Sequence, residues 1–401
     1  MPQIVIKHNK AREIFWNNRT LPTNVEIELS WSDTLKLSRL FSLDIRNNIV
    51  PSYNSEHWKN KRYGFTGDAD TASGFGNCTV NLVRQSLKNG YDVRWLGRHT
   101  NIPDFRHLST LEIPTDIGMV WHEQPKHEWL DTPFGRNIAI VPFETTQIPL
   151  SWVKRINSFD ALFVPCRQNI EMMQNSGINI PIELIHWGVD PNLFYPLKRE
   201  DKDIFTFGTM GALSVRKGTD ILVKAFDLAF PSKNFKDVRL LCKTSYSTYM
   251  FGSKDPRIKV DMLAVDNEEL MKSFFGQINC FIFPTRGEGA GLPPIEAMAT
   301  GVPAIVTNWS GPVDYMTPEI GWTIDYKMVP AKNFTEQIYK EDCGNWAEPS
   351  IDDLVEKMRY AYYHRDEVKS KGIAAGEHIK NNWTWDKQIG LYFDALNRHL
   401  S

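Results

Sequence analysis

Residues 281–312 read FIFPTRGEGAGLPPIEAMATGVPAIVTNWSGP, and this stretch decides the fold of the second half of the chain. An apolar run of strand length, 278–283, leads into a glycine-rich turn and then into a helical pattern from Pro293 to Thr300. Prolines suit the first turn of a helix, where a missing N–H costs little. The sequence therefore predicts a strand–turn–helix unit of an α/β sheet, with free helix amides at the turn.

Two carboxylates flank this turn. Glu288 precedes the predicted helix, and Glu296 lies inside its first turns. Glycines let the backbone approach a ligand closely, and the amides at a helix N-terminus can bind a diphosphate without a metal. Carboxylates accept hydrogen bonds from sugar and ribose hydroxyls. The pattern therefore predicts a site for a sugar that is linked to a nucleoside diphosphate.

The spacing of Glu288 and Glu296 resembles the E-x7-E signature of the retaining, GT-B-fold glycosyltransferases of family 4, the glycosyl transferases group 1. The flanking GAGLPPIEAMATGVPAI follows the pattern of that family, and the resemblance covers roughly residues 64–398. It implies an α/β protein of GT-B fold, in which two doubly wound Rossmann-like domains face a central cleft and a C-terminal helix crosses back to the N-terminal domain.

The resemblance also assigns roles at this turn. Glu288 would face the donor sugar, and Glu296 would hold the nucleotide ribose. The backbone that contacts the sugar hydroxyls and the diphosphate would come from Gly289, Ala290, Gly291 and Leu292. The alternative is an ordinary Rossmann-like connection without this ligand.

A second segment, GALSVRKG, precedes a predicted helix over Thr219–Ala229 and contributes Gly211 to the donor site. Arg216 can clamp phosphate oxygens through its planar fork, and Lys217 supplies a compact charge. Together they can stabilise the charge that develops on a departing diphosphate. The segment resembles the basic phosphate-binding segment of the family, although the earlier arginine of that motif is replaced by Thr209. A solvated surface pair is the alternative.

The N-terminal half offers weaker candidates. Gly74, Phe75 and Gly76 precede a predicted helix over 79–87 and fit the family's glycine-rich loop near the diphosphate and the acceptor, or else a plain turn at a helix start. His122 follows an apolar run, and the resemblance places a histidine of this kind beside the donor sugar. Glu144 is a second candidate for the cleft, with a helix-start acid as its alternative.

Neighbouring residues leave part of this assignment open. Glu123, His127 and Glu128 compete with His122 for the cleft position, and a structural histidine is a further alternative. Asp68 and Asp70 have the form of a metal-binding D-x-D, but we interpret them as a chance match because the chain carries its own phosphate-binding cations. The sequence therefore predicts no metal and no cofactor.

Composition agrees with a multidomain enzyme. The chain has 401 residues, 42% hydrophobic and 23% charged, enough for roughly two or three domains. A formal net charge of -2 disfavours nucleic acid as a partner without excluding a local basic patch. Because no apolar run approaches the length of a membrane span and no signal-peptide core is present, we expect a cytoplasmic protein, with peripheral membrane association left open. Five scattered cysteines predict reduced core thiols.

Alternating strand and helix patterns predict two α/β domains. We expect an N-terminal extension or added edge strand at 1–60, an acceptor-binding domain at 61–195, a nucleotide-sugar-binding domain at 196–380, and a C-terminal helix at 381–401 that packs back on the N-terminal domain. Proline and charge mark residues 186–196 as the hinge.

The expected activity is the transfer of a sugar, with retained configuration, from a nucleotide-diphosphate sugar to a hydroxyl acceptor. Family frequency favours a UDP-sugar first and a GDP-sugar second, and a glycan or lipid-linked glycan precursor as the acceptor. The expected catalytic residues are Glu288, Arg216, Lys217 and His122. Three alternatives stay open: a sugar-nucleotide hydrolase or epimerase, a non-catalytic sugar-nucleotide-binding subunit, and a glycosyltransferase that acts on a modified DNA base.

Overall fold

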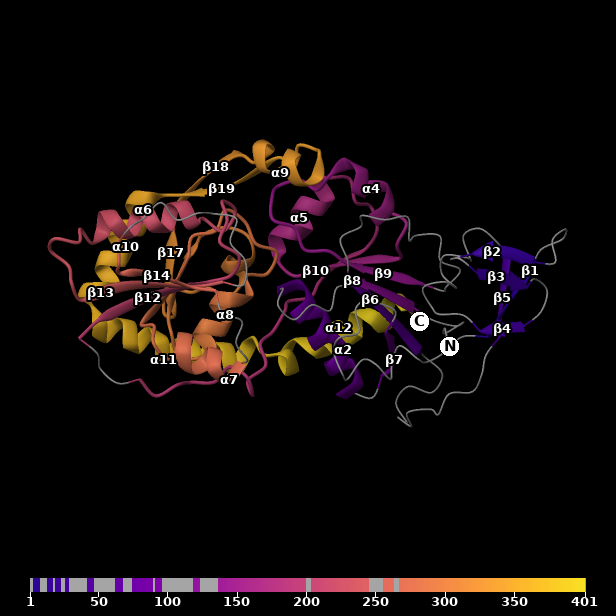
Figure 1. Ribbon diagram of the computed structural model, residues 1–401, viewed down its shortest axis with the longest axis horizontal. Coiled ribbons are helices and arrows are strands. Elements are labelled where there is room, and N and C mark those ends of the chain that lie inside the picture. Colours follow the sequence, from indigo (N-terminus) through magenta and orange to yellow (C-terminus); the bar gives the residue numbers. More distant parts are fainter. Residues whose placement is uncertain are drawn as a thin grey trace.

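Two six-stranded parallel sheets form the two large lobes of the molecule (Figure 1). The computed structural model describes residues 3–7, 13–16, 19–22, 26–28, 42–46, 62–67, 74–88, 91–95, 118–122, 136–199, 203–244, 255–262 and 267–400. The two doubly wound α/β domains predicted from the sequence are both present.

The first sheet has the strand order β11-β10-β9-β8-β6-β7. Its strands are β6 (Arg62–Gly67), β7 (Asp92–Trp95), β8 (Gly118–His122), β9 (Asn137–Ile140), β10 (Ala161–Val164) and β11 (Ile182–Leu184), and its helices are α2 (Gly74–Lys88), α4 (Leu150–Ile156) and α5 (Arg167–Asn175). All four residues of β10 are buried apolar residues, which is typical of a parallel strand that is covered on both faces.

The second sheet has the order β14-β13-β12-β15-β16-β17. Its strands are β12 (Phe205–Met210), β13 (Val238–Lys243), β14 (Ile258–Asp261), β15 (Cys280–Phe283), β16 (Ala304–Thr307) and β17 (Gly321–Ile324). Its helical segments are α6 (Thr219–Ala229), α7 (Asn267–Leu270) with a π-helical turn (Met271–Phe275), α8 (Leu292–Ala299), a 3-10 turn (Gly311–Asp314), α10 (Ile351–Tyr363) and α11 (Arg365–Asn382). Helix α6 has the bounds predicted for it.

The C-terminal helix α12 (Trp385–Leu400) returns to the first domain, as the sequence predicted. At the crossing, Val189 of the hinge pairs with Thr384. Near its end, His399 contacts Glu183 of β11 at 2.8 Å, and Phe393 stacks on Tyr91 with ring centroids 3.8 Å apart. The residue before α12 therefore pairs with the hinge, and the helix itself packs on the first domain.

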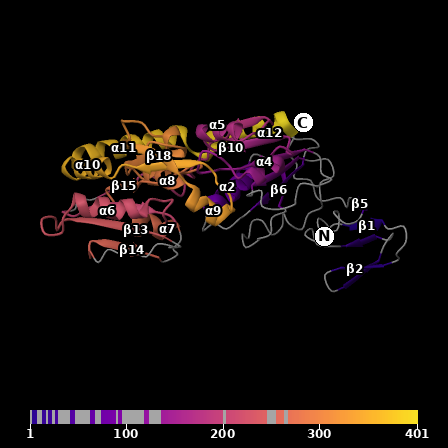
Figure 2. The same cartoon turned by 90° about the horizontal axis from the view of Figure 1, so that it is seen from above.

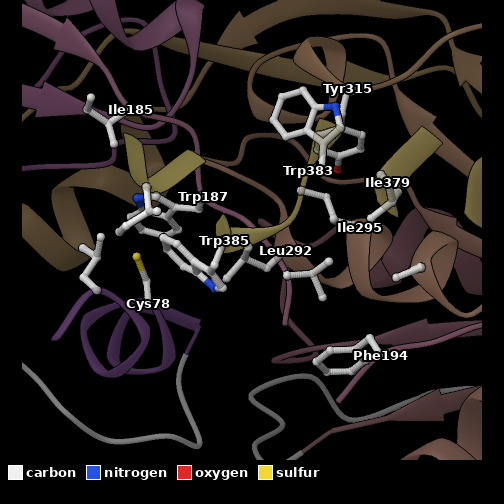
Figure 3. Close-up of a cluster of buried hydrophobic side chains, with 14 of the residues drawn as sticks. Cys78, Ile185, Trp187, Phe194, Leu292, Ile295, Tyr315, Ile379, Trp383 and Trp385 are labelled. Carbon is white, nitrogen blue, oxygen red and sulfur yellow. The ribbon is translucent and has the colours of Figure 1, made fainter. Parts of the chain in front are cut away.

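One hydrophobic cluster continues through the crossing (Figure 3). Figure 3 shows Trp187 and Trp385 beside Cys78 of α2, with Leu292 of α8 near them. Tyr315 and Trp383 meet edge to face, with ring centroids 5.6 Å apart. The domains thus share a core on the side of the crossing. All five cysteines are free and buried, which confirms the prediction of core thiols.

One feature was not predicted. Strands β18 (Tyr326–Pro330) and β19 (Asn345–Pro349) pair antiparallel and carry helix α9 (Lys332–Tyr339) between them. These elements extend from the second domain to the first, where α9 lies near α4 (Figure 1). We call residues 326–349 the bridging arm.

The glycine-rich segment around residue 75 differs from its prediction. Gly74, Phe75 and Gly76 are the first residues of α2, rather than a loop before it. Glycine lowers helix propensity by about 1 kcal/mol, so the sequence favoured a turn. Burial of Gly76 and Cys78 against the domain core extends the packed face of the helix into its first turn, and this packing outweighs the local preference.

The N-terminal strands form a unit of their own at one end of the molecule (Figure 2). Strands β1 (Gln3–Lys7), β4 (Glu26–Glu28) and β5 (Ser42–Arg46) make a three-stranded antiparallel sheet, and β2 (Glu13–Trp16) pairs with β3 (Arg19–Pro22). In the described part of the chain these strands pair only with one another.

No helix among the described residues combines the length and the apolar character that crossing a membrane requires.

Candidate functional site

Three of the predicted residues meet at one edge of the second sheet. Strands β12 and β15 are parallel neighbours, so the loops that follow them leave the sheet side by side. Lys217 Nζ donates to both carboxylate oxygens of Glu288, at 2.7 and 2.9 Å. Arg216 Nη1 donates to Glu288 Oε1 at 3.1 Å. The fold thus brings together a carboxylate and two cations that are about seventy positions apart in the sequence.

The backbone of Glu288 is fixed independently of its side chain. Ser310 Oγ accepts from the Glu288 N–H and donates to the Glu288 carbonyl, at 2.9 Å in each case. Ser310 has a φ of 59°, a conformation that non-glycine residues adopt only where the surroundings impose it. The carboxylate is therefore presented from a rigid turn.

Helix α8 begins directly after this turn. Its N-cap is Gly291, with a φ of 75° that favours glycine, and prolines stand in its first turn as predicted. The Gly291 carbonyl accepts a hydrogen bond from Tyr315 Oη at 2.9 Å. The N-terminal amides of the helix provide a partial positive charge at the same edge of the sheet as Arg216 and Lys217.

The loop that follows β9 in the first domain packs directly against this turn. A Cβ atom on Gly287 would lie 1.9 Å from the carbonyl oxygen of Glu144, and one on Gly289 would lie 2.4 Å from Cβ of Pro142. Glu144 Oε1 is 3.6 Å from Arg216 Nη1. Arg216 therefore lies between a carboxylate of each domain, and Glu144 belongs to the cluster as the sequence suggested.

Burial and charge act in opposite directions on the two cations. Burial alone would lower the pKa of Arg216, but Glu144 and Glu288 raise it above its ordinary value. Burial lowers the pKa of Lys217, and the attraction of Glu288 offsets this only in part. Arg216 is therefore always charged, whereas the pKa of Lys217 depends on its attraction to Glu288.

Glu296 lies in α8 and is only 9% exposed. Within the described part of the chain, its carboxylate takes part in no hydrogen bond or ion pair. Burial raises its pKa to about 7. A buried carboxylate without a partner is costly, and a pKa perturbed in this way is typical of a binding or catalytic site.

The raised pKa of Glu296 predicts a pH-dependent cost in stability. Its folded-state pKa of about 7 lies above the ordinary value of 4.5, so the stabilisation from protonated Glu296 is complete below the lower value and is lost as the pH rises through 7. We expect Glu296→Gln to melt at a higher temperature than wild type at pH 8, and at the same temperature at pH 4, below the ordinary pKa of 4.5. Calorimetry at both pH values measures this, and an equal difference at the two would contradict the assignment.

Other predicted residues are only partly described. His122 ends β8, opposite Gly67 of the neighbouring strand, but only its backbone is described, and the same holds for Phe75. Asp68, Asp70, Glu123, His127 and Glu128 lie outside the described residues. In the part of the chain that is described, no three His, Cys, Asp or Glu side chains group as metal ligands would.

The remaining donor-site residues lie around the cluster. Gly211 follows β12, with a φ of 127°, and a Cβ there would lie 3.9 Å from Lys217 Cε. Leu292 begins α8 and is buried. A Cβ on Gly311 would lie 2.6 Å from the Ala290 carbonyl. The predicted residues Gly289, Ala290, Gly291 and Leu292 thus form one continuous turn beside the cluster.

Sequence reasoning missed Arg286, which lies two positions before Glu288. Its guanidinium binds Asp220 at 2.8 and 2.9 Å and Glu348 at 2.6 and 2.8 Å. Both partners are distant in the sequence. The only local signal was a lone charge between apolar and glycine residues, which fits either a ligand contact or a buried ion pair.

Residues 196–340 match the family described as glycosyl transferases group 1. This segment contains Arg216, Lys217, Glu288 and Glu296. The chain is 31% identical to the capsular polysaccharide biosynthesis glycosyltransferase CapM of Staphylococcus aureus over 142 residues, which are 32% of this chain and 36% of CapM. The chain thus spans just over a third of the length of that relative.

Solved structures resemble a larger part of the chain. Sucrose-phosphate synthase from Thermosynechococcus elongatus has a TM-score of 0.61 at 15% identity, covering 84% of this chain and all of its own. HepE from Anabaena, in complex with UDP and glucose, has a TM-score of 0.61 at 11% identity, covering 84% of this chain and 99% of its own. At these identities the likeness shows the fold, which confirms the expected GT-B architecture.

Proposed function

We propose that this protein is a retaining glycosyltransferase, which moves a sugar from a nucleotide-diphosphate sugar to a hydroxyl acceptor. The observation that carries the proposal is the cluster of Glu288, Arg216 and Lys217 beside the start of α8. The segment that matches the glycosyl transferases group 1 contains this cluster. A UDP-sugar is the first candidate donor and a GDP-sugar the second.

The donor would occupy the edge of the second sheet. Arg216, Lys217 and the first amides of α8 supply positive charge for the diphosphate. Glu296 supplies a carboxylate whose two oxygens can accept hydrogen bonds from the vicinal hydroxyls of ribose. An ionised carboxylate accepts stronger hydrogen bonds than a neutral one. Ribose binding would give the buried Glu296 carboxylate these partners, so it would lower the pKa of Glu296 and favour the charged form.

The proposed reaction needs no protein nucleophile. The acceptor oxygen attacks the anomeric carbon on the face from which the diphosphate leaves, the bond between that carbon and the phosphate oxygen breaks, and the diphosphate oxygen receives both the electron pair and the acceptor proton. Arg216 and Lys217 stabilise the charge on the leaving group. Glu288 holds the two cations and orients the sugar. The scheme includes no metal and no cofactor.

We propose that the first domain binds the acceptor. Glu144 reaches the cluster from that domain, and β8, which ends at His122, runs parallel to β9, the strand before the Glu144 loop. We therefore keep His122 as a candidate contact of the donor sugar. A glycan or lipid-linked glycan precursor is the proposed acceptor class, supported by the description of CapM as an enzyme of capsular polysaccharide biosynthesis.

Measuring donor consumption with and without an acceptor distinguishes this function from its alternatives. A glycosyltransferase turns over its donor much faster when an acceptor is present, because closure of the domains excludes water. A hydrolase or epimerase would consume the donor without an acceptor, and a non-catalytic subunit would bind it unchanged. A transferase for modified DNA bases would need glycosylatable DNA in the same assay.

A thermal-shift screen tests donor binding first. We expect one UDP- or GDP-sugar to raise the melting temperature without added metal, because a ligand at 100 times its Kd stabilises the native state by about 2.7 kcal/mol. Glu296→Ala should lose this shift, whereas Glu356→Ala, an exposed acid on α10, should keep it. A shift that survives Glu296→Ala, or no shift with any nucleotide sugar, would contradict the proposed site.

A further inference from the structure

The far end of the bridging arm is joined to the first domain by tight and specific contacts. The Thr146 amide donates to the Asn345 carbonyl at 2.9 Å, and the Asn345 amide donates to Thr146 Oγ1 at 2.8 Å. Gly344 has a φ of 77°, and a Cβ there would lie 2.5 Å from Thr146 Oγ1. This end of the arm therefore fits the first domain only with glycine at position 344.

Side chains of the arm also complete a core of the first domain. Tyr339 packs between Phe143 and Trp152, with ring centroids 5.4 and 5.5 Å away. Cys343 is fully buried in the same cluster. Glu341 accepts hydrogen bonds from the hydroxyl and amide of Ser151. Since apolar surface from both domains is buried here, docking of the arm stabilises the contact between the two domains.

The near end of the arm is bonded to Arg286. Glu348 of β19 pairs with the guanidinium, and the Ala347 amide donates to the Arg286 carbonyl at 3.0 Å. The Trp346 ring lies 5.6 Å from the guanidinium carbon. The arm thus connects Arg286 to a surface of the other domain.

Arg286 in turn holds the loop that carries the two cations. Its amide donates to the Arg216 carbonyl at 2.8 Å, and its guanidinium donates to the Val215 carbonyl. It also pairs with Asp220 in the first turn of α6, directly after that loop. Two residues later the chain reaches Glu288. Every segment that supplies the cluster from the second domain is therefore bonded to Arg286.

We infer that Arg286 is a positioning residue, which couples docking of the bridging arm on the first domain to the placement of Arg216, Lys217 and Glu288. Closure of the cleft and assembly of the site are then one event rather than two. An arginine is required because its planar fork serves two carboxylates and a carbonyl at once, and a lysine cannot. The inference rests on the proposed function only in the choice of the ligand used to test it.

Hydrogen exchange on the full-length protein without nucleotide is the first test. We expect Gly344→Ala to accelerate exchange about tenfold at the Thr146 amide, which donates to the arm, and also at the Arg286 amide, which donates to Arg216. The Leu240 amide in β13 should keep its wild-type rate. The coupling is refuted if Thr146 accelerates while Arg286 does not, or if neither does.

Gly177→Ala is the matched control. Gly177 has a φ of 94°, but the nearest atom to a Cβ there is Val153 Cγ1 at an ordinary 3.7 Å. It imposes comparable backbone strain without the collision at the arm. We expect the Thr146 and Arg286 amides to keep their wild-type rates in this variant. Acceleration of both would show that strain rather than docking controls them, which would overturn the inference.

Calorimetric titration with UDP gives a second, independent readout. We expect Gly344→Ala and Glu348→Gln each to weaken the Kd for UDP about tenfold, and the double variant to bind no more weakly than either, because both changes break one connection. A loss of about a hundredfold in the double variant would show independent effects and contradict the coupling. If wild type does not bind UDP, the proposed donor fails while hydrogen exchange still decides the role of Arg286.

Discussion

Replacing Lys217 by Gln is expected to lower turnover about 100- to 1,000-fold, the range found when one donor that stabilises developing negative charge is removed. The ammonium is buried and within 2.9 Å of both oxygens of Glu288. It is a compact charge at the edge of the sheet where the diphosphate would leave. Gln keeps much of the length of the side chain and can donate a hydrogen bond, but it carries no charge. The loss should therefore fall on kcat more than on KM for the donor.

Lys224→Gln is the control for this experiment. Lys224 lies exposed on α6, the helix that follows the Lys217 loop. The same change there should leave turnover near that of wild type, because it removes a solvated charge far from the cluster. Normal turnover in Lys217→Gln would mean that the lysine serves only to neutralise Glu288. A loss confined to KM would mean that it binds substrate and transition state equally.

Glu288→Gln is the second large effect, and we expect turnover to fall about 100-fold. The neutral amide cannot hold two cations, and Lys217, whose pKa is already lowered by burial, loses the carboxylate that favours its charged form. The cluster therefore loses both its geometry and part of its positive charge. The profile of kcat against pH should shift as well, with activity falling at a lower pH than in wild type as Lys217 deprotonates.

The fold should survive the loss of the Glu288 carboxylate. Ser310 holds the backbone at Glu288 through two hydrogen bonds that do not involve the side chain, and Arg216 keeps Glu144 as a partner. Circular dichroism should match that of wild type, and Glu356→Gln on the exposed face of α10 should retain full activity. If Glu288→Gln transfers sugar at the normal rate, the carboxylate neither orients the sugar nor organises the cations.

The sequence predicted the two parallel sheets because a strand that is buried on both faces is a short, continuous apolar run. Strand β10 is a continuous apolar run, and α6 begins directly after the left-handed Gly218. The sequence singled out four candidate site residues because they lie at strand–helix junctions, where ligands of open α/β sheets bind: Arg216, Lys217, Glu288 and Glu296.

Contacts between residues that are distant in the sequence could not be predicted. The partners of Arg286 lie on α6 and on the bridging arm, so its role depends on a pairing that no local pattern encodes. Tyr339 of the arm reads as a surface residue on a polar helix, and its burial depends on Phe143 and Trp152 of the other domain. The early start of α2 was missed for a related reason, because burial of Gly76 and Cys78 in its first turns outweighs the low helix propensity of glycine.

The central claim is that this cleft holds a nucleoside diphosphate between two cations and a buried carboxylate. A crystal structure of the protein with UDP tests it most directly. We predict diphosphate oxygens about 3 Å from Lys217 Nζ and from the Arg216 guanidinium, and ribose hydroxyls at the same distance from the Glu296 carboxylate. UDP bound elsewhere, or bound here with its diphosphate turned away from both cations, would contradict the account.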